Sequence, residues 1–289
     1  LSELIDHGIF GYPVITDKYY HSVCDWQKEN YKLQVNINDI IFTTGVVSSI
    51  KHLINIFSKQ NDNILVQTPV YNPFFSIIKQ TKRNVLINRL IENKNSYIID
   101  FNDFRKKAKI AKIFILCNPH NPVGRVWTRE ELIEMAKICL ENNVIIISDE
   151  IHSDFTYENN FHIPIVSLGD ELKKITITCN SPTKSFNLAS LKISYLIIMH
   201  KVLKEQINNY MSNYEIDSPT IFGLEALYAS YNFCKDWLTE AKSYIYENYL
   251  FLKKYINEEI PFIKLFKLEG TYLAWIDFRE LQVDNKTIN

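Results

Sequence analysis

Through most of its length the sequence alternates short runs of apolar, often β-branched residues with longer amphipathic segments. This alternation is typical of βαβ units, in which helices cover both faces of a mostly parallel sheet. The predicted strands are residues 40–43, 64–68, 85–90, 113–117, 144–148, 175–179 and 193–199. Most are apolar at nearly every position, as strands buried on both faces should be. We therefore expect an α/β fold: a three-layer α/β/α domain with a mostly parallel, seven-stranded sheet.

The clearest early helix is predicted at residues 128–143, where Thr128 and Glu131 form a capping box. Beyond Lys201 the pattern changes to long helices at 202–211, 219–231 and 234–256, with short strands at 262–266 and 271–278. We interpret residues 1–205 as a large domain that begins with an N-terminal arm. Residues 206–289 are interpreted as a helical linker and part of a smaller α+β C-terminal domain.

Composition argues against several classes of protein. The 289 residues are 46% hydrophobic and 22% charged, which suits a globular chain with one large core or two unequal domains. Lys and Arg total 32 against 33 Asp and Glu, so the net charge of -1 favours neither nucleic acid nor an anionic membrane as a partner. No bilayer-spanning apolar stretch and no signal peptide are visible. We expect a small-molecule partner.

The five cysteines include no CxxC pair, and no histidines have zinc-ligand spacing. The pattern therefore predicts no metal site and no disulfide framework, and it favours a reduced, cytoplasmic setting. Cys117 and Cys179 lie in strand-like runs and are expected to be small core residues. Because the sequence starts at Leu1 and not at Met, we expect the native N-terminus to lie upstream.

In an open α/β sheet, ligands bind beyond the carboxyl ends of the strands, so the residues that follow each predicted strand are the site candidates. In TTGVVSSIKHL, Gly45 follows a strand and opens a helix, whose N–H groups and dipole favour a phosphate, although most such junctions are only turns. In QTPVYNPF, Tyr71 stands between two prolines, and its ring faces either a flat ligand or the following helix.

Two further strand ends are polar. CNPHNPVGRVW is a Pro-punctuated loop in which Asn121 either caps a turn or contacts a ligand. In NVIIISDEIHSD, Asp149 follows a strand without a polar face, and a carboxylate there needs a positive partner to offset its desolvation. Glu150, His152 and Asp154 are also compatible with ordinary loop or structural roles.

In CNSPTKSFNLASL, Lys184 follows the strand at 175–179 and lies among Ser, Pro, Thr and Asn. A lysine is usually solvated, but a desolvated one loses its proton more readily and becomes a nucleophile. A desolvated, nucleophilic Lys184 is favoured when it is considered together with other residues at the strand ends of one sheet: Asp149, Asn121, Tyr71 and Gly45. A flat, phosphorylated, cationic heteroaromatic aldehyde would use all of these residues.

The motifs resemble those of fold-type I enzymes that use pyridoxal 5′-phosphate (PLP), in the class I and II aminotransferase group. More narrowly, the chain is similar to the cystathionine β-lyase-like C-S lyases of that group. The resemblance covers essentially the whole chain and rests on HGIFGYP, TGVV, TPVYNPF, NPHNPVGRVW, SDEIHSDF, SPTKSFNLASL and EGTYLAWIDF. The histidine of DEIHSD, where typical transaminases of the group carry tyrosine, indicates the lyase branch.

The resemblance implies PLP as the cofactor and a role for each candidate. Lys184 would bond to the cofactor's aldehyde and then remove the substrate's α-proton. Asp149 would keep the pyridine nitrogen protonated, so that the ring withdraws electrons from the reacting carbon. Asn121 would donate to the phenolic oxygen with His152 close to the same edge, and Tyr71 would stack on the ring.

The resemblance also implies a phosphate site and a partner subunit. Backbone N–H groups of Gly45, Val46 and Val47 and the Ser181 hydroxyl would bind the phosphate. Tyr12 matches a tyrosine that reaches the phosphate of the neighbouring subunit, which implies a homodimer with shared sites. A core or interface aromatic without cofactor contact is the alternative for Tyr12.

Two features depart from the family pattern. Many of these enzymes carry a phosphate-binding arginine where this chain has Lys192, which offers a point charge without a bidentate fork. The arginine that binds the substrate carboxylate is expected beyond EGTYLAWIDF, and no residue up to Asn289 matches it. We therefore expect a C-terminally truncated chain, which is either active or folded but inactive.

The implied reaction is α,β-elimination on cystathionine- or cysteine-type amino acids, which gives a thiol, pyruvate and ammonia. Two alternatives remain open. An aminotransferase of the same group would use the same residues. A PLP-binding sensor domain would resemble transcription regulators that carry a basic helix-turn-helix domain upstream, and this sequence shows no such domain.

Overall fold

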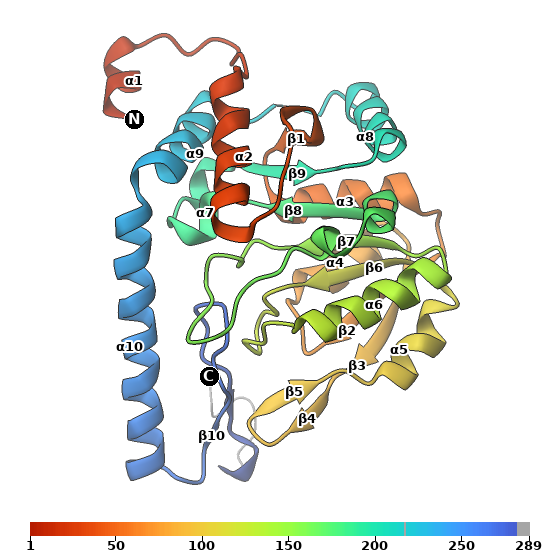
Figure 1. The fold of residues 1–289 in the computed structure, drawn as a ribbon, viewed down its shortest axis with the longest axis vertical. Helices are drawn as coiled ribbons and strands as arrows, with labels where there is room; N and C mark the ends of the chain where they lie inside the picture. Colours follow the sequence, from red (N-terminus) through yellow and green to blue (C-terminus); the bar gives the residue numbers. More distant parts are fainter. Residues whose placement is uncertain (217, 282–289) are drawn as a thin grey trace.

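The computed structural model describes residues 1–216 and 218–281, and its centre is a seven-stranded sheet in the order β1-β9-β8-β7-β6-β2-β3 (Figure 1). The strands are β1 (Ile40–Thr43), β2 (Asn63–Thr68), β3 (Asn84–Arg89), β6 (Ala111–Cys117), β7 (Ile145–Asp149), β8 (Thr176–Asn180) and β9 (Ser194–Ile197). β9 is antiparallel to both of its neighbours, and the other adjacent pairs are parallel. The predicted mostly parallel sheet is confirmed, and each strand predicted for it overlaps one of these.

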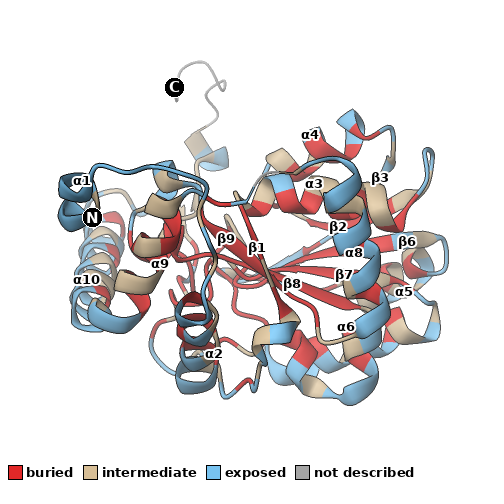
Figure 2. Ribbon diagram, turned by 90° about the horizontal axis from the view of Figure 1, so that it is seen from above, coloured by how far each residue is buried: buried red, intermediate tan, exposed pale blue. Residues whose placement is uncertain are grey.

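Helices cover both faces of the sheet, whose strands are buried between them except for the edge strand β3, where only one residue is buried (Figure 2). One face packs against α3 (Val46–Phe57), α4 (Pro73–Gln80) and α8 (Lys201–Asn213), and the other against α5 (Phe101–Ala108) and α6 (Arg129–Glu141). Within β2, Ile64 and Val66 belong to the first core and Leu65 to the second. This alternation follows from the period of two in a strand, and it explains why the sequence is apolar at consecutive positions.

The predicted capping box is present at the start of α6. The Thr128 side chain accepts a hydrogen bond from the Glu131 N–H (3.2 Å), and the Glu131 carboxylate accepts one from the Thr128 N–H (2.9 Å). These bonds satisfy two N–H groups that the first helical turn leaves free. They also define where the loop after β6 ends and the helix begins.

The remaining helices form a third packing region. A third core cluster joins α2 (Asp17–Tyr31), α9 (Ile221–Phe233) and α10 (Lys235–Glu259) to β1 and β9, and the long α10 runs along one side of the molecule (Figure 1). The helices predicted at 202–211, 219–231 and 234–256 are thus confirmed as α8, α9 and α10. The domain boundary after residue 205 remains a prediction, and residues 282–289 of the second domain lie outside the described residues.

The predicted strands at 262–266 and 271–278 were too long. They contain only β10 (Lys264–Leu265) and β11 (Ile276–Asp277), an antiparallel pair. The chain between them bonds to the loop after β6: the N–H groups of Glu269 and Gly270 both donate to the Gly124 carbonyl at 2.9 Å. A Cβ added to Gly270 would lie 2.7 Å from the Val126 side chain, so only glycine permits this approach.

A short antiparallel hairpin was not predicted. It comprises β4 (Ile91–Asn93) and β5 (Ser96–Ile98) and lies apart from the main sheet. Every residue of β4 is exposed, so its sequence lacks the apolar pattern that marks the buried strands.

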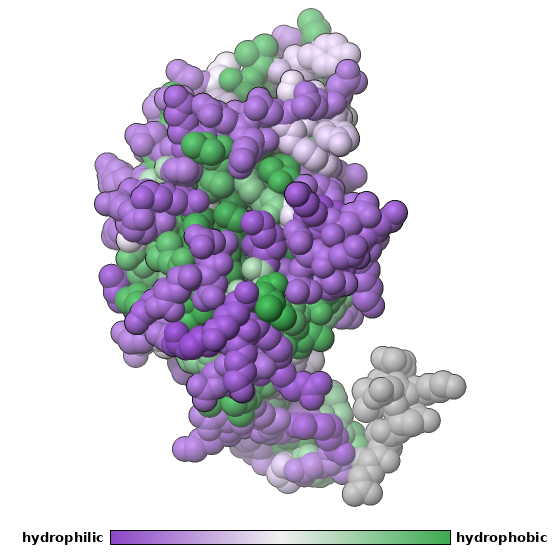
Figure 3. Space-filling view, turned by 90° about the vertical axis from the view of Figure 1, so that its right-hand side faces the viewer, coloured by the Kyte–Doolittle hydropathy of each residue, from purple (hydrophilic) through white to green (hydrophobic). Residues whose placement is uncertain are grey.

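The surface is mainly hydrophilic on the face shown in Figure 3, with smaller hydrophobic areas between the polar side chains. No helix in the described part of the chain is long and apolar enough to cross a bilayer. At the N-terminus, α1 (Ser2–His7) and the segment after it leave Ile9, Phe10, Tyr12 and Val14 exposed. The segment reaches the rest of the molecule at Phe10, whose ring centroid lies 5.5 Å from that of Phe222 in α9.

Candidate active site

A cavity of about 410 Å³ lies where the loops after β1, β2, β6, β7 and β8 meet. This position, beyond the carboxyl ends of the strands, is the expected ligand site of an open α/β sheet. All but two of the predicted site residues line it: Gly45, Val46, Val47, Tyr71, Asn121, Asp149, His152, Lys184 and Lys192. Residues that the sequence separates by up to 147 positions, Gly45 and Lys192, are thereby brought into one wall.

The N-terminus of α3 forms one end of the cavity. Gly45 is its N-cap and has an extended backbone, and no side chain caps the first turn. Gly45, Val46, Val47 and Ser48 line the cavity, and a Cβ built on Gly45 would meet nothing within 4 Å. Free N–H groups, the positive end of the helix dipole and open space together suit an anion such as a phosphate.

Asp149 is the last residue of β7 and only 5% exposed. Its Oδ1 accepts a hydrogen bond from the Ile151 N–H at 3.2 Å. Burial raises the pKa of Asp149 to about 7; the Ile151 N–H and Lys184 act in the opposite direction, and Glu150 adds to the rise. The sequence predicted a cationic partner for Asp149. Lys184 acts on Asp149 through its charge, but among the described residues no cationic side chain forms an ion pair with Asp149 within 4 Å. A cation bound in the cavity would complete the pairing.

Asn121 and His152 are joined across two loops. The Asn121 amide nitrogen lies 3.3 Å from His152 Nε2. Burial, reinforced by the charge of Lys184, lowers the pKa of His152 to about 4, so the imidazole is neutral at physiological pH. With Nε2 accepting from the amide, Nδ1 carries the hydrogen, and Nδ1 is buried without a hydrogen-bond partner among the described residues. A polar group at this part of the wall therefore remains to be satisfied.

Tyr71 packs on the following helix, as one interpretation predicted, and its contact with a flat ligand remains a prediction. Its side chain lines the cavity, and its ring also packs edge-on against Phe74 in the following helix, with centroids 5.7 Å apart. The contact with Phe74 fixes the ring at the cavity wall, where it offers a flat apolar surface.

Lys184 lies in the one-turn helix α7 (Pro182–Ser185) and lines the cavity. Ser181 caps this helix by accepting a hydrogen bond from the Thr183 N–H at 3.0 Å. The Ser181 hydroxyl also donates to the Ile193 carbonyl at 2.6 Å, and Ser181 does not line the cavity. Thr183, which the sequence did not single out, lines it instead. The phosphate role predicted for Ser181 therefore remains a prediction, and its hydroxyl is already engaged.

Lys192 lines the cavity from a left-handed backbone conformation (φ 49°). Tyr12, in contrast, is fully exposed in the N-terminal segment and is not part of the wall. Its predicted contact with a neighbouring subunit lies beyond what a single chain contains and remains a prediction.

The sequence did not indicate the wall contributed by the C-terminal segment. Tyr272 and Leu273, from the EGTYLAWIDF motif, both line the cavity. The Tyr272 ring packs edge-on against His152 at 5.3 Å and against Phe155 at 5.3 Å. The motif itself was a signal, but only the fold shows that its return to the loop after β7 brings Tyr272 to the site.

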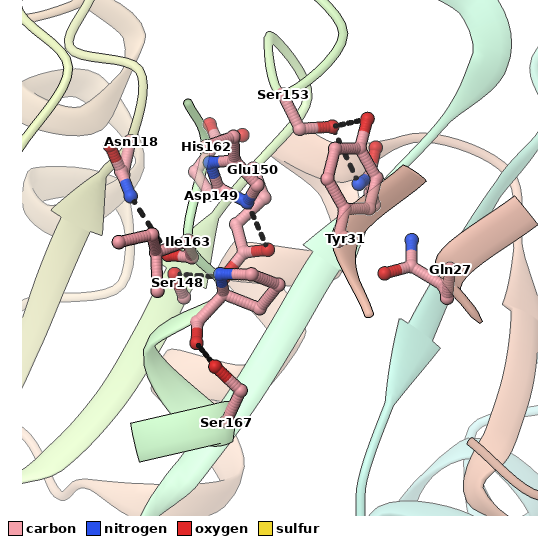
Figure 4. A network of polar contacts seen from close by, with 12 residues as sticks. Gln27, Tyr31, Asn118, Ser148, Asp149, Glu150, Ser153, His162, Ile163 and Ser167 are labelled. Atoms are coloured by element: carbon pink, nitrogen blue, oxygen red, sulfur yellow. Dashed lines mark hydrogen bonds and ion pairs between the residues drawn. The ribbon is translucent and has the colours of Figure 1, made fainter. Parts of the chain in front are cut away.

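Glu150, interpreted as an ordinary loop acid, is a fully buried carboxylate (0% exposed). It accepts hydrogen bonds from Ser148 Oγ at 2.8 Å and from His162 Nε2 at 2.9 Å; Figure 4 shows these side chains and the neighbouring Asp149. The three groups anchor the turn that follows β7 and so hold the backbone that carries Asp149. Among the described residues, no group of three or more His, Cys, Asp or Glu side chains is arranged to bind a metal ion.

Comparisons with known proteins identify the family. The model of aminotransferase class I and II matches residues 4–288. Cystathionine beta-lyase PatB of Bacillus subtilis is 36% identical over 280 residues, which cover 96% of this chain and 72% of PatB. Cystalysin from Treponema denticola, whose structure contains pyridoxal 5′-phosphate, superimposes with a TM-score of 0.96 at 34% identity over 99% of this chain and 73% of its own. The PLP-bound C-S lyase from Staphylococcus hominis gives 0.92 at 31% identity, over 98% and 73% respectively.

The chain therefore belongs to the class I and II aminotransferase family. Within that family it is similar to the cystathionine β-lyase and C-S lyase members, as the motifs predicted. The structural match extends over nearly the whole chain, so the PLP fold-type I architecture is confirmed as well.

The pKa of Asp149 predicts a specific pH dependence of stability for the ligand-free chain. An unfolded aspartate ionises near pH 4, whereas the folded one keeps its proton up to about pH 7. As pH rises from about 4 to 7, the unfolded state is therefore increasingly favoured, and this destabilisation is complete above pH 7. We expect Asp149→Asn to unfold at higher urea concentration than the wild type at pH 8, by a few kcal/mol in free energy.

The stabilisation by Asp149→Asn should shrink as the pH falls toward 4. Urea unfolding at pH 4, 6 and 8 measures it, and Asp25→Asn at an exposed position of α2 controls for the loss of one charge. A difference between Asp149→Asn and wild type that does not change with pH would contradict the pKa of about 7.

Proposed function

We propose that this protein is a PLP-dependent C-S lyase that catalyses α,β-elimination on cystathionine- or cysteine-type amino acids. The observation that carries the proposal is that one cavity contains Lys184, the buried carboxylate of Asp149 and the uncapped N-terminus of α3. The named activity of PatB and of the Staphylococcus hominis C-S lyase supports the reaction class.

The cavity fits PLP at both of its charged ends. The N-terminus of α3 suits the phosphate, and Lys192 adds a positive charge in the same wall. Asp149, buried and without an ion-pair partner in the described part of the chain, suits the protonated pyridine nitrogen. Tyr71 offers a face for the ring, and the joined side chains of Asn121 and His152 offer polar groups for the phenolic oxygen. The hydroxyl of Thr183 is a further candidate for the phosphate, in addition to Ser181.

When bound, PLP supplies an aldehyde that bonds to an amine and a protonated ring that withdraws electrons from the substrate's α-carbon. With PLP bound, Lys184 Nζ would be the amine that holds it and the base that removes the substrate's α-proton. Asp149 would hold the proton on the ring nitrogen. Because the imidazole of His152 is neutral, it adds no positive charge that would compete for Asp149.

Elimination breaks two bonds of the substrate. The α-proton passes to Lys184, and the electrons of the Cβ–S bond leave with sulfur, which takes up a proton to give the thiol. Addition of one water then yields pyruvate and ammonia. A thiolate is a good enough leaving group for this step, which is why sulfur-containing amino acids are the proposed substrates. An aminotransferase would use the same residues but would return the proton elsewhere and transfer the amino group to a 2-oxo acid.

One test of the proposed function concerns the covalent bond between Lys184 and PLP. Borohydride reduction of the PLP-treated chain should fix one pyridoxyl group on Lys184, since this amine shares the cavity with Asp149. Peptide mass spectrometry locates the modified lysine. Lys184→Ala should abolish the modification, and Lys51→Ala, on the surface of α3, should not. Modification of Lys192 in place of Lys184 would contradict the assignment.

Another test distinguishes elimination from amino transfer as the catalysed reaction. The chain loaded with PLP should release pyruvate from L-cystathionine in the absence of any 2-oxo acid. Lactate dehydrogenase and NADH report the pyruvate as it forms. Lys184→Ala should lower the rate by at least about a hundredfold, because the general base and the covalent anchor are lost together. Turnover that requires an added 2-oxo acid would instead identify an aminotransferase.

We also propose a homodimer in which the N-terminal arm, residues 1–16, contacts the partner subunit and Tyr12 approaches its phosphate site. The arm exposes Ile9, Phe10, Tyr12 and Val14, and exposed apolar side chains of this density commonly mark an interface.

Sedimentation equilibrium should therefore find twice the monomer mass of 34.0 kDa. Replacing Ile9 and Val14 by Asp should shift the protein toward the monomer, because two buried charges would be unpaired at the interface. Ile133→Asp, at an exposed apolar position on α6, is the matched control and should leave the dimer intact. A wild-type monomer at micromolar concentration would refute the dimer.

A further inference from the structure

A second buried polar group lies outside the wall of the cavity, behind Lys184. We call it the Asp154 cluster, and it comprises Trp26, Tyr31, Ser153, Asp154 and Ser185. Asp154 is 8% exposed, and none of the five residues lines the cavity. By its sequence position alone, Asp154 is indistinguishable from an ordinary loop acid, and the proposed reaction does not use it.

Three donors converge on the Asp154 carboxylate. Oδ1 accepts hydrogen bonds from Trp26 Nε1 at 3.1 Å and from the Tyr31 hydroxyl, and Oδ2 accepts one from Ser185 Oγ. Burial, with the charge of Asp154, raises the pKa of Tyr31 well above its ordinary value, so the phenol remains a donor. Hydrogen bonds to an ionised acceptor are stronger than those between neutral groups, and three of them fix the carboxylate in one orientation.

In the described part of the chain, no salt bridge accompanies these bonds. Lys242 of α10 is influenced by the charge of Asp154: burial lowers the pKa of Lys242, and Asp154 opposes this change. Among residues 1–216 and 218–281, Lys242 and Asp154 do not approach within ion-pair distance. Asp154 is therefore held by directional contacts to specific side chains, and one of these belongs to the segment that carries Lys184.

The Asp154 cluster joins two stretches of chain that both reach the cavity. Ser185 follows Lys184 in α7, a helix of four residues that is too short to be stable by itself. Lys184 lines the cavity, whereas the Ser185 hydroxyl bonds to Asp154. On the other stretch, Asp154 follows His152 by two residues, and His152 also lines the cavity. The bond from Ser185 to Asp154 thus ties the two stretches together from behind.

A second link runs parallel to the first. Ser153 Oγ lies 3.0 Å from the Tyr31 hydroxyl and donates to it, because the single Tyr31 hydrogen goes to Asp154. Ser153 Oγ also accepts a hydrogen bond from Asn180 Nδ2 at 3.1 Å, and Figure 4 shows Tyr31 and Ser153 in contact. Asn180 is the last residue of β8, so this link fixes the chain that enters α7. The loop after β7, the end of β8 and the end of α2 are thereby locked to one another around Lys184.

We propose that Asp154 is a positioning residue: through Ser185 it holds the α7 turn, and hence Lys184, at a fixed place in the cavity. This inference rests on the proposed function, because the position of Lys184 matters only if Lys184 bonds to PLP. Without the bond, the short turn is expected to sample other backbone conformations, and Lys184 Nζ would be correctly placed for only part of the time.

Substitutions at the two ends of the bond test the role. Ser185→Ala removes the donor, and Ser185→Thr keeps the hydroxyl and is the conservative rescue. Asp154→Asn keeps the shape but turns one acceptor oxygen into a donor that faces a donor. Asp100→Asn is the matched control, because Asp100 is a helix-capping carboxylate at the start of α5, accepts a hydrogen bond from the Asp103 N–H and is not a member of the Asp154 cluster.

The first readout is the rate at which Lys184 becomes attached to PLP, trapped by borohydride and counted by peptide mass spectrometry. Loss of a hydrogen bond to a charged group should slow attachment by about tenfold or more in Ser185→Ala and in Asp154→Asn. Ser185→Thr and Asp100→Asn should stay near the wild-type rate. The double variant Asp154→Asn with Ser185→Ala should be no slower than the slower single variant, since both changes remove one interaction.

The second readout needs no cofactor. Hydrogen-deuterium exchange of the amides in residues 182–188 should be faster in Ser185→Ala and Asp154→Asn than in wild type, with thermal unfolding confirming that each variant folds. If wild-type Lys184 never attaches to PLP, the proposed function is wrong, and the exchange data still decide whether Asp154 holds the turn. Wild-type exchange and attachment in both variants, or additive slowing in the double variant, would overturn the positioning role.

Discussion

The Asp149 carboxylate, buried at the end of β7 without a full ion pair in the described chain, is the constraint on which the site depends. Burial opposes its ionisation, so a cation bound beside it would be favoured more strongly than at any exposed acid. The uncapped N-terminus of α3, in the same cavity, favours an anion. A ligand with a negative group at one end and a positive ring nitrogen at the other satisfies both, and Lys184 supplies the amine that such an aldehyde requires.

The scaffold that holds this arrangement is rigid for identifiable reasons. The strands that end at the cavity are buried on both faces, so they cannot shift without disturbing two cores. The loop after β6 is fixed from outside, because Arg125 pairs with both Glu131 at 2.7 Å and Glu269 at 2.9 Å. Glu150 and His162 anchor the turn after β7, and the Asp154 cluster anchors the turn that carries Lys184. Each loop of the site thus has its own buried polar anchor.

The sequence predicted the sheet and most of the cavity wall because both depend on local pattern. A continuous apolar run reveals a strand buried on two faces, and a polar residue directly after it lies at the ligand-binding edge. This reasoning found Gly45, Asp149 and Lys184, which line one cavity. It did not identify Glu150 and Asp154 as the buried carboxylates that hold the loops, because in the sequence both resemble loop acids. Only the fold brings their hydrogen-bond donors, His162 for Glu150 and Tyr31 and Ser185 for Asp154, from distant segments. The exposed strand β4 was not predicted, and β10 and β11 were predicted too long, for a related reason: their pairing does not produce an apolar pattern in the sequence.

The most direct test of the account is a crystal structure of the chain grown with PLP. The account predicts electron density that continues from Lys184 Nζ into the cofactor, with the ring nitrogen hydrogen-bonded to Asp149 and the phosphate at the N-terminus of α3. Density for a cofactor whose ring nitrogen faces away from Asp149, or a cavity without cofactor and Lys184 directed to solvent, would contradict it.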